Sequence, residues 1–155
     1  MWIAHNVKIE VFAYNEEKED TKKGLLSLCP ETVLNEINEG NIKIEEQVMK
    51  GKREEEKDIT IYRLNLEKRK DSTAFVKQLL KNLNDENLEN KLSKRIDESC
   101  KCYIRLDKKS LFKGEYKLIF GGDCFHIRIA LAVFPKKKKR AKELLKETLN
   151  NSTLN

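Results

Sequence analysis

Two clusters of side chains in the second half of the sequence could bind a negatively charged ligand. The first is the lysine run, Lys136-Lys137-Lys138-Lys139-Arg140, which separates a strand-like apolar segment from a leucine-rich segment with helical spacing. Cations at a helix N-terminus repel one another and face the positive end of the helix dipole, so local stability does not explain them. A bound phosphate would explain them, because both the free backbone N–H groups and the side-chain charges would point at it.

Helical spacing divides this run into an outward and an inward part. We take the buried stripe of the helix to be Ala141, Leu144, Leu145 and Thr148. The spacing then directs Lys136, Lys139 and Arg140 away from the core, and these three are the predicted phosphate contacts. The alternative interpretation is a solvated lysine cluster with no ligand, since charge runs are often only solvated.

The second cluster follows from alternation in two predicted strands, 100–107 and 124–134. Each strand has one apolar face, and alternation places the other side chains on the opposite face. If the strands share a sheet, that face carries Tyr103, Arg105, His126 and Arg128. An aromatic ring and guanidinium planes can stack bases and bind phosphate, as in sheet-based RNA modules. The alternative is that this face packs on a helix or on another subunit.

Lys108 and Lys109 follow the first of these strands and add two more candidate RNA contacts. Lys108 could also join Arg105 and Arg128 as a phosphate clamp around His126, with the imidazole acting as general base in a metal-free ribonuclease. The other histidine, His5, alternates onto the core face of its own strand. We therefore expect no two-histidine acid/base pair and no catalytic residues.

Three cysteines and one histidine are of the residue types that bind zinc, but their expected positions do not allow them to bind one ion together. Alternation places Cys100 and Cys102 on the core face, whereas Cys124 and His126 lie on the opposite face. Four ligands on opposite sides of a sheet cannot meet at one ion. We expect buried, reduced cysteines, no metal and no cofactor.

Composition indicates one soluble domain in a reducing, cytoplasmic setting. The chain has 155 residues, of which 39% are hydrophobic and 37% charged, and no apolar run approaches the roughly 20 residues that span a bilayer. Residues 1–100 contain 18 Lys/Arg and 21 Asp/Glu, a net charge of −3, whereas residues 101–155 contain 14 and 5, a net charge of +9. Such an asymmetric charge favours a polyanion as partner.

The elements that would position these residues can be predicted from periodicity and capping. We expect strands at 3–14, 41–50, 58–66, 100–107 and 124–134, and helices at 16–28, from a cap at Ser72, from Asn84-Asp85 to Ile96, and at 136–150. The order β-α-β-β-α-α-β-β-α predicts an α+β two-layer sandwich, with helices on one face of a largely antiparallel sheet. Residues 1–150 would form one domain and residues 151–155 a flexible tail.

The stretches "RIDESCKCYIRLDKKSLFKGEYKL" (95–118) and "GGDCFHIRIALAVFPKKKKRA" (121–141) also carry a resemblance. Over nearly the whole chain, the sequence resembles a family of small archaeal RNA-binding proteins described as predicted exosome subunits. That family has a fold similar to the ribosomal protein that binds the small RNA of the large subunit. The sequence departs from the family pattern at Cys102, at Lys109-Ser110 and at Lys137.

The resemblance implies a non-catalytic RNA-binding protein, an accessory of RNA processing or decay or a protein of ribosome-related RNA. Its partners would be RNA and RNA-processing or exosome proteins, without a membrane. The residues alone leave a second function class open, a protein-interaction module that docks an acidic partner. The sequence does not fix the oligomeric state, and a dimer is compatible with it.

Overall fold

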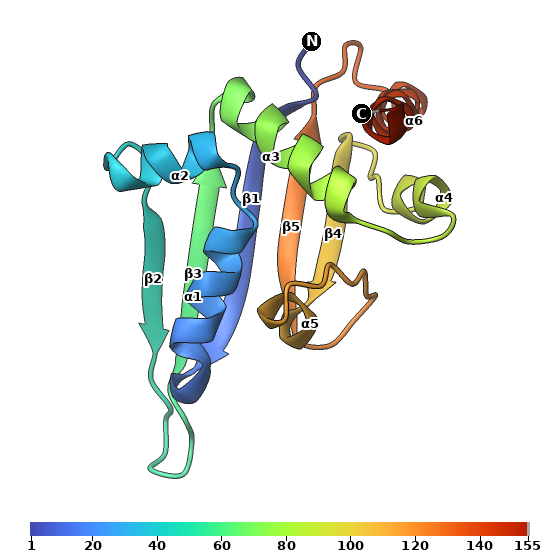
Figure 1. The fold of residues 1–155 in the computed structure, drawn as a ribbon. Helices are drawn as coiled ribbons and strands as arrows, with labels where there is room; N and C mark the ends of the chain where they lie inside the picture. The colour runs from blue at the N-terminus through green and yellow to red at the C-terminus, as the bar shows by residue number, and fades with distance from the viewer. Residues whose placement is uncertain (155) are drawn as a thin grey trace.

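The computed structural model describes residues 1–154 and consists of one five-stranded sheet with helices against it (Figure 1). In chain order the elements are β1 (Ala4–Tyr14), the 3-10 turn η1 (Asn15–Glu17), α1 (Lys18–Ser27), α2 (Glu31–Asn38), β2 (Ile44–Met49), β3 (Ile59–Leu66), α3 (Arg69–Asn82), α4 (Leu88–Ser93), β4 (Lys101–Asp107), α5 (Lys108–Phe112), β5 (Cys124–Leu131) and α6 (Lys138–Leu154).

The sheet is antiparallel throughout, with strand order β2-β3-β1-β5-β4. The long strand β1 lies at its centre, because its alternating Val7, Ile9 and Val11 give it a fully buried face that suits a central position. The predicted hairpin between 41–50 and 58–66 is confirmed as β2 and β3. The two-layer α+β prediction is confirmed as well.

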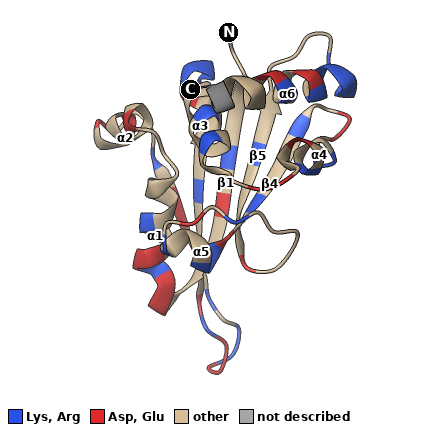
Figure 2. Ribbon diagram, turned by 45° about the vertical axis from the view of Figure 1, so that its right-hand side comes forward, with Lys and Arg blue, Asp and Glu red and all other residues tan. Residues whose placement is uncertain are grey.

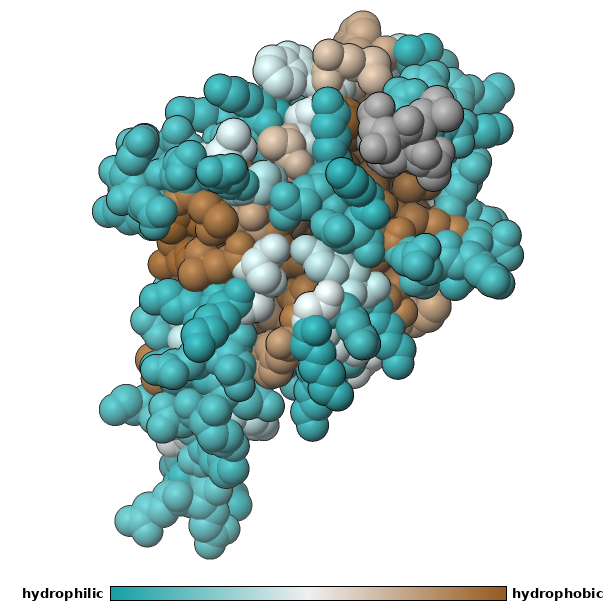
Figure 3. All heavy atoms as spheres, in the orientation of Figure 1, coloured by the Kyte–Doolittle hydropathy of each residue, from teal (hydrophilic) through white to brown (hydrophobic). Residues whose placement is uncertain are grey.

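The helices cover one face of this sheet. Figure 1 shows α1 lying along β3 and β1 and α3 crossing the strands, whereas α4 and α6 lie together beyond β4. The core between the layers is apolar: α3 contributes Phe75, Val76 and Leu79, which pack with the inward residues of β1. Seen from the helix side, the surface is mostly hydrophilic, with apolar atoms showing between the helices (Figure 3). The opposite face of the sheet is the open face.

Several element boundaries differ from the sequence-based prediction. Ser72 is not the cap of α3: the helix begins at Arg69, and the Ser72 hydroxyl donates to the Leu66 carbonyl. The strand predicted to end at 134 ends at Leu131, and the last helix begins at Lys138 rather than at 136. The predicted helix reaching Ile96 ends at Ser93.

Two short helices were not predicted. Pro30 follows the end of α1, as expected. It also takes the N-cap position of α2, with an extended backbone directly before the first helical residue. Helix α5 lies in what was predicted to be a plain connection over 108–123, where Asp107 accepts a hydrogen bond from the Ser110 backbone N–H and caps it. None of the helices within residues 1–154 is long and apolar enough to cross a membrane. The end of the predicted tail, residue 155, lies outside the described residues, and the domain boundary at 150 stays a prediction.

Candidate nucleic-acid interface

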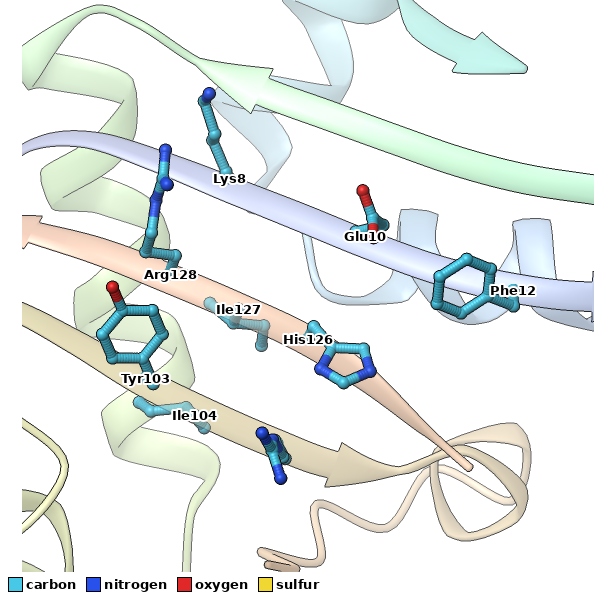
Figure 4. Close-up of a pocket in the computed structure, with 9 residues that line it drawn as sticks. Lys8, Glu10, Phe12, Tyr103, Ile104, His126, Ile127 and Arg128 are labelled. Atoms are coloured by element: carbon cyan, nitrogen blue, oxygen red, sulfur yellow. The ribbon is translucent and has the colours of Figure 1, made fainter. Parts of the chain in front are cut away.

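The register of three neighbouring strands builds a row of side chains across the open face. Lys8 on β1 lies opposite Arg128 on β5, and Arg128 lies opposite Tyr103 on β4. Figure 4 shows these three side chains on the same side of the sheet. The row combines two cations with one aromatic ring.

A second row runs beside the first, one pair of residues further along the strands. Glu10, His126 and Arg105 lie opposite one another on β1, β5 and β4. Both rows and Phe12 line a single hollow of about 340 Å³. The prediction that Tyr103, Arg105, His126 and Arg128 share one open face is therefore confirmed.

The outer edge of β4 is covered by two irregular segments that extend the open face. The Tyr103 N–H donates to the Arg95 carbonyl at 3.1 Å, and the Ile119 N–H donates to the Arg105 carbonyl at 2.9 Å. Where the segments meet, the Arg95 guanidinium lies 4.4 Å from the ring centroid of Phe120, which is 57% exposed. Sequence analysis missed Arg95 and Phe120 as parts of the site, because neither belongs to a strand with regular alternation.

Tyr103 is held in place by its hydroxyl, which donates to Asp97 Oδ2 at 3.0 Å. The other oxygen of Asp97 accepts from the backbone N–H groups of Ser99 and Lys101. These hydrogen bonds, the one from Lys101 foremost, lower the pKa of Asp97 to about 2. The hydrogen bond to Asp97 also raises the pKa of the Tyr103 hydroxyl, so the side chain stays uncharged at neutral pH. Tyr103 is 40% exposed on the open face.

His126 presents a neutral ring to this hollow. Burial and then the charge of Arg105 lower its pKa, so the imidazole is uncharged at neutral pH. Its Nε2 lies 3.4 Å from Cys124 Sγ, and its ring meets Phe12 edge to face at 6.4 Å between centroids. His126 therefore contributes an aromatic surface rather than a positive charge.

His5 differs from the prediction. A bulge between Ala4 and Asn6 interrupts the alternation of β1, so His5 is half-buried rather than part of the core. Five residues of strand separate His5 from Glu10, the neighbour of His126, a distance of roughly 17 Å. The two histidines are therefore too far apart to act on one bond.

Lys108 also differs from the prediction, because its side chain points inward. The residue is 2% exposed, and its ammonium lies 3.2 Å from both Glu17 Oε2 and Asp123 Oδ1 and also donates to the Phe12 carbonyl. All three of its donors are used within the protein. Lys108 thus ties α5 to β1 and is not part of the surface formed by Tyr103 and Arg128.

The remaining predicted contacts lie away from the hollow. Lys109 is exposed on α5, beyond the C-terminal end of β4. Lys136, Lys139 and Arg140 are exposed around the start of α6, as the helical spacing predicted. That helix packs against α3 and α4, so the lysine run belongs to the helix layer (Figure 2).

The lysine run is not uniform. Lys138 is half-buried, and its ammonium lies 3.5 Å from Glu98 Oε1. Lys139 lines a hollow between α4 and α6 that also contains Glu89. The segment that leads to Lys136 lies at the beginning of β1, because the Ala132 N–H donates to the Ile3 carbonyl at 2.8 Å. Burial, then the charges of Arg69 and Lys136, lower the pKa of His5 there. Whether these cations contact RNA stays a prediction.

The four cysteines are buried thiols. Burial raises the pKa of Cys29 and of Cys102 to about 12, so both stay protonated at neutral pH. Across residues 1–154, no three His, Cys, Asp or Glu side chains are grouped as metal ligands would be.

Comparison with known proteins agrees with this picture. A family model described as RNA binding matches residues 6–131. Over 150 residues, the chain is 28% identical to the RNA-binding protein PAB1135 of Pyrococcus abyssi, covering 94% of each.

Solved structures share the fold. Mth689, a DUF54 protein from Methanothermobacter thermautotrophicus, superposes with a TM-score of 0.74 at 22% identity, covering 95% of this chain and 98% of its own. The DUF54 protein AF2318 from Archaeglobus fulgidus superposes with a TM-score of 0.70 at 24% identity, covering 94% of this chain and 99% of its own. With the family model matching most of its length, this chain belongs to the RNA-binding family.

Proposed function

We propose that this protein binds RNA without cleaving it, through the open face of its sheet. The observation that carries the proposal is the row of Arg95, Tyr103, Arg128 and Lys8, which crosses three strands and the segment that pairs with β4. Cations spaced by neighbouring strands, about 5 Å apart, suit the backbone of a nucleic acid, and the ring among them suits a base.

The unequal pairing of the open-face arginines supports this assignment. Arg63 on β3 donates to Glu10 Oε2 and to Gln47 Oε1, each at 2.8 Å, and is thereby neutralised. Arg105 donates to the Phe120 carbonyl, an acceptor that carries no charge. The positive charge of Arg105 is therefore left for a ligand, and binding to phosphate would not require an internal ion pair to break.

The absence of catalysis is part of the proposal. His126 is the sole imidazole in the hollow, and its hydrogen-bonding neighbour is the Cys124 thiol rather than a carboxylate that would orient it as a base. His5 lies too far away to serve as a partner. End-labelled RNA incubated with the purified protein should stay intact with and without Mg²⁺, and cleavage that His126→Gln abolishes would contradict this.

Binding can be tested with two double variants that each remove two positive charges from the protein. We expect Lys8→Gln/Arg128→Gln to weaken binding of a labelled single-stranded RNA about tenfold or more, measured by fluorescence anisotropy at low salt, because two phosphate contacts are lost. The matched control is Lys77→Gln/Lys81→Gln, which removes the same charge from exposed positions on α3. Equal losses in the two variants would mean that only net charge matters, and would overturn the proposal.

The cellular role proposed here is that of an accessory in RNA processing or decay, associated with the exosome or with ribosome-related RNA. The resemblance of 95–118 and 121–141 to predicted exosome subunits supports it. Crosslinking of the tagged protein in its own cells, followed by sequencing of the attached RNA, should recover processing intermediates or ribosomal RNA. Recovery of neither would contradict this role.

A second candidate function is docking of an acidic protein partner at the start of α6. Phe134 is 89% exposed and is separated from the lysine run only by Pro135, so an apolar anchor lies beside a cluster of cations. Such a pair is typical of a protein-binding surface. A partner retained after nuclease treatment, and lost in Phe134→Ala, would support this function beside RNA binding.

A further inference from the structure

The open face contains two adjoining hollows of different chemistry that share Lys8 and Arg128. The first, of about 340 Å³, is bordered by the rings of Phe12, Tyr103 and His126. The second, of about 400 Å³, also contains Asn6, Asn65, Glu67 and Lys101. An aromatic hollow thus adjoins a cationic one, the combination that a nucleotide requires for its base and its phosphate.

We propose that these two hollows hold one unpaired nucleotide, with its base stacked among the rings and its phosphate on the cations, so that the protein selects single-stranded RNA over duplex RNA. This inference rests on the proposed function and specifies the kind of RNA that the open face receives.

Arg128, which lines the cationic hollow, has a donor without an acceptor. The Nε of Arg128 is buried and has no hydrogen-bond partner within residues 1–154. A buried guanidinium nitrogen without an acceptor is costly, so the side chain is not held in this position by its own hydrogen bonds. A phosphate in the hollow would accept charge-assisted bonds from the outer N–H groups of the guanidinium, and Nε would gain an acceptor once the side chain turned toward it. Three cations line this hollow against the single carboxylate of Glu67, so its net charge suits a phosphodiester.

The aromatic hollow is already organised for stacking. The Asp97 carboxylate holds the Tyr103 hydroxyl, and the Phe12 and His126 rings support each other edge to face. Phe12 and Tyr103 are nonetheless 39% and 40% exposed, so their faces remain accessible. Rings fixed before binding lose little conformational entropy when a base stacks on them.

Geometry favours an unpaired base over a duplex. In an A-form helix the bases lie inside, and the narrow major groove admits no protein ring. A duplex laid on the sheet would present its sugar-phosphate backbone and the base edges of its shallow minor groove, but no base face on which Tyr103 and Phe12 could stack. Only a base outside a helix can enter the aromatic hollow while its own phosphate reaches Arg128.

The test compares three RNAs of equal length by fluorescence anisotropy: a single strand, the same strand with abasic sites, and its duplex. We expect wild-type protein to bind the single strand about tenfold to a hundredfold more tightly than the other two. Tyr103→Leu, which keeps an apolar side chain but removes the ring, should reduce this preference, whereas Tyr103→Phe should keep most of it.

The outcomes separate the two proposals. Equal binding of all three RNAs would overturn the stacked nucleotide and leave RNA binding intact, whereas no binding of any RNA would overturn the proposed function. If Tyr103→Leu fails to fold by circular dichroism, wild-type protein with 2-aminopurine in the RNA gives an independent measurement. Stacking should change the probe's fluorescence on binding, and an unchanged signal would overturn the inference. A dimer that buries the open face and persists in excess RNA would also overturn it.

Discussion

Lys108 shows how a single residue can be assigned to the wrong surface by its position in the sequence. It follows a strand whose polar residues face outward, and it stands beside the exposed Lys109. Lys108 is in phase with the inward positions of β4 (102, 104 and 106), so its side chain points inward, toward Glu17 and Asp123. Its charge therefore stabilises the contact between α5 and the beginning of α1 instead of contacting a ligand.

This difference between neighbours leads to a prediction. Lys108→Met should lower the free energy of unfolding by about 2 kcal/mol, because it leaves the half-buried Glu17 carboxylate without its partner. Lys109→Met, at an exposed position of the same helix, should change it by less than about 0.5 kcal/mol. Urea denaturation followed by circular dichroism measures both. Equal stability of the two variants would show that the ion pair contributes nothing.

At the residue scale, the sequence predicted the part of the site that follows regular alternation. Tyr103, Arg105, His126 and Arg128 could be placed together because period 2 fixes which side chains share a face. Arg95 and Phe120 could not, since their meeting depends on two irregular segments that pair with the edge of β4. Local sequence contains no information on which segments will cover a sheet edge.

At the scale of elements, Gly24 in α1 illustrates why propensity alone misleads. Glycine disfavours a helix interior, so Gly24 weakens the prediction of a helix at 16–28. The structure supplies the reason for a glycine: a Cβ at this position would lie 2.9 Å from Phe125 Cζ on β5. The helix can approach the sheet closely only because this side chain is missing.

Gly24→Ala should therefore destabilise the protein, although alanine favours a helix by about 1 kcal/mol. Phe125 is fully buried and cannot move aside without disturbing the core, so overpacking should cost about 1–3 kcal/mol. The thermal unfolding midpoint measures the net effect, and we expect it to fall.

The Phe125→Leu background provides the control for this prediction. Removing the ring should make room for the alanine methyl group, so Gly24→Ala should be neutral or stabilising there. A coupling between the two substitutions is the mark of direct contact. If Gly24→Ala raises the unfolding midpoint of the wild-type protein, helix α1 does not approach Phe125 as closely as described.

The short helices α2 and α5 and the bulge at His5 mark the limit of element prediction. Helices of eight and five residues are not stable on their own and form here because the core and the Asp107 cap support them. The bulge shifts the alternation of β1 by one position, and the pattern of residue types did not predict this shift. Long, strongly periodic elements such as β1 and α3 were predicted, and those that depend on tertiary contacts were not.

At the scale of the whole molecule, the positive charge of residues 101–155 is divided between two sides of the fold. Arg105 and Arg128 lie on the open face, whereas the lysine run begins a helix that packs in the helix layer against α3 and α4. An RNA that contacts both must pass around the end of the sheet where β1 begins. The two regions should therefore respond differently to the length of the RNA.

Salt dependence measures this division. On a single strand of about five nucleotides, Lys136→Gln/Lys139→Gln/Arg140→Gln should leave binding unchanged, because such a strand covers only the open face. On a strand of about 30 nucleotides, the same variant should reduce the slope of log affinity against log salt by up to about 2, as roughly 0.7 is lost for each phosphate released. Lys8→Gln/Arg128→Gln should reduce the slope for both lengths.

Each other outcome identifies a different arrangement of the surface. If the triple variant weakens the short strand as much as the long one, the lysine run and the open face form one continuous site, contrary to their placement in separate layers. If it changes neither, the run is only solvated, and the aromatic and cationic hollows account for binding alone. If it affects only the long strand, the length at which the triple variant first takes effect measures the path of RNA from Arg128 to Lys136, a distance that charge patterning along the chain cannot give.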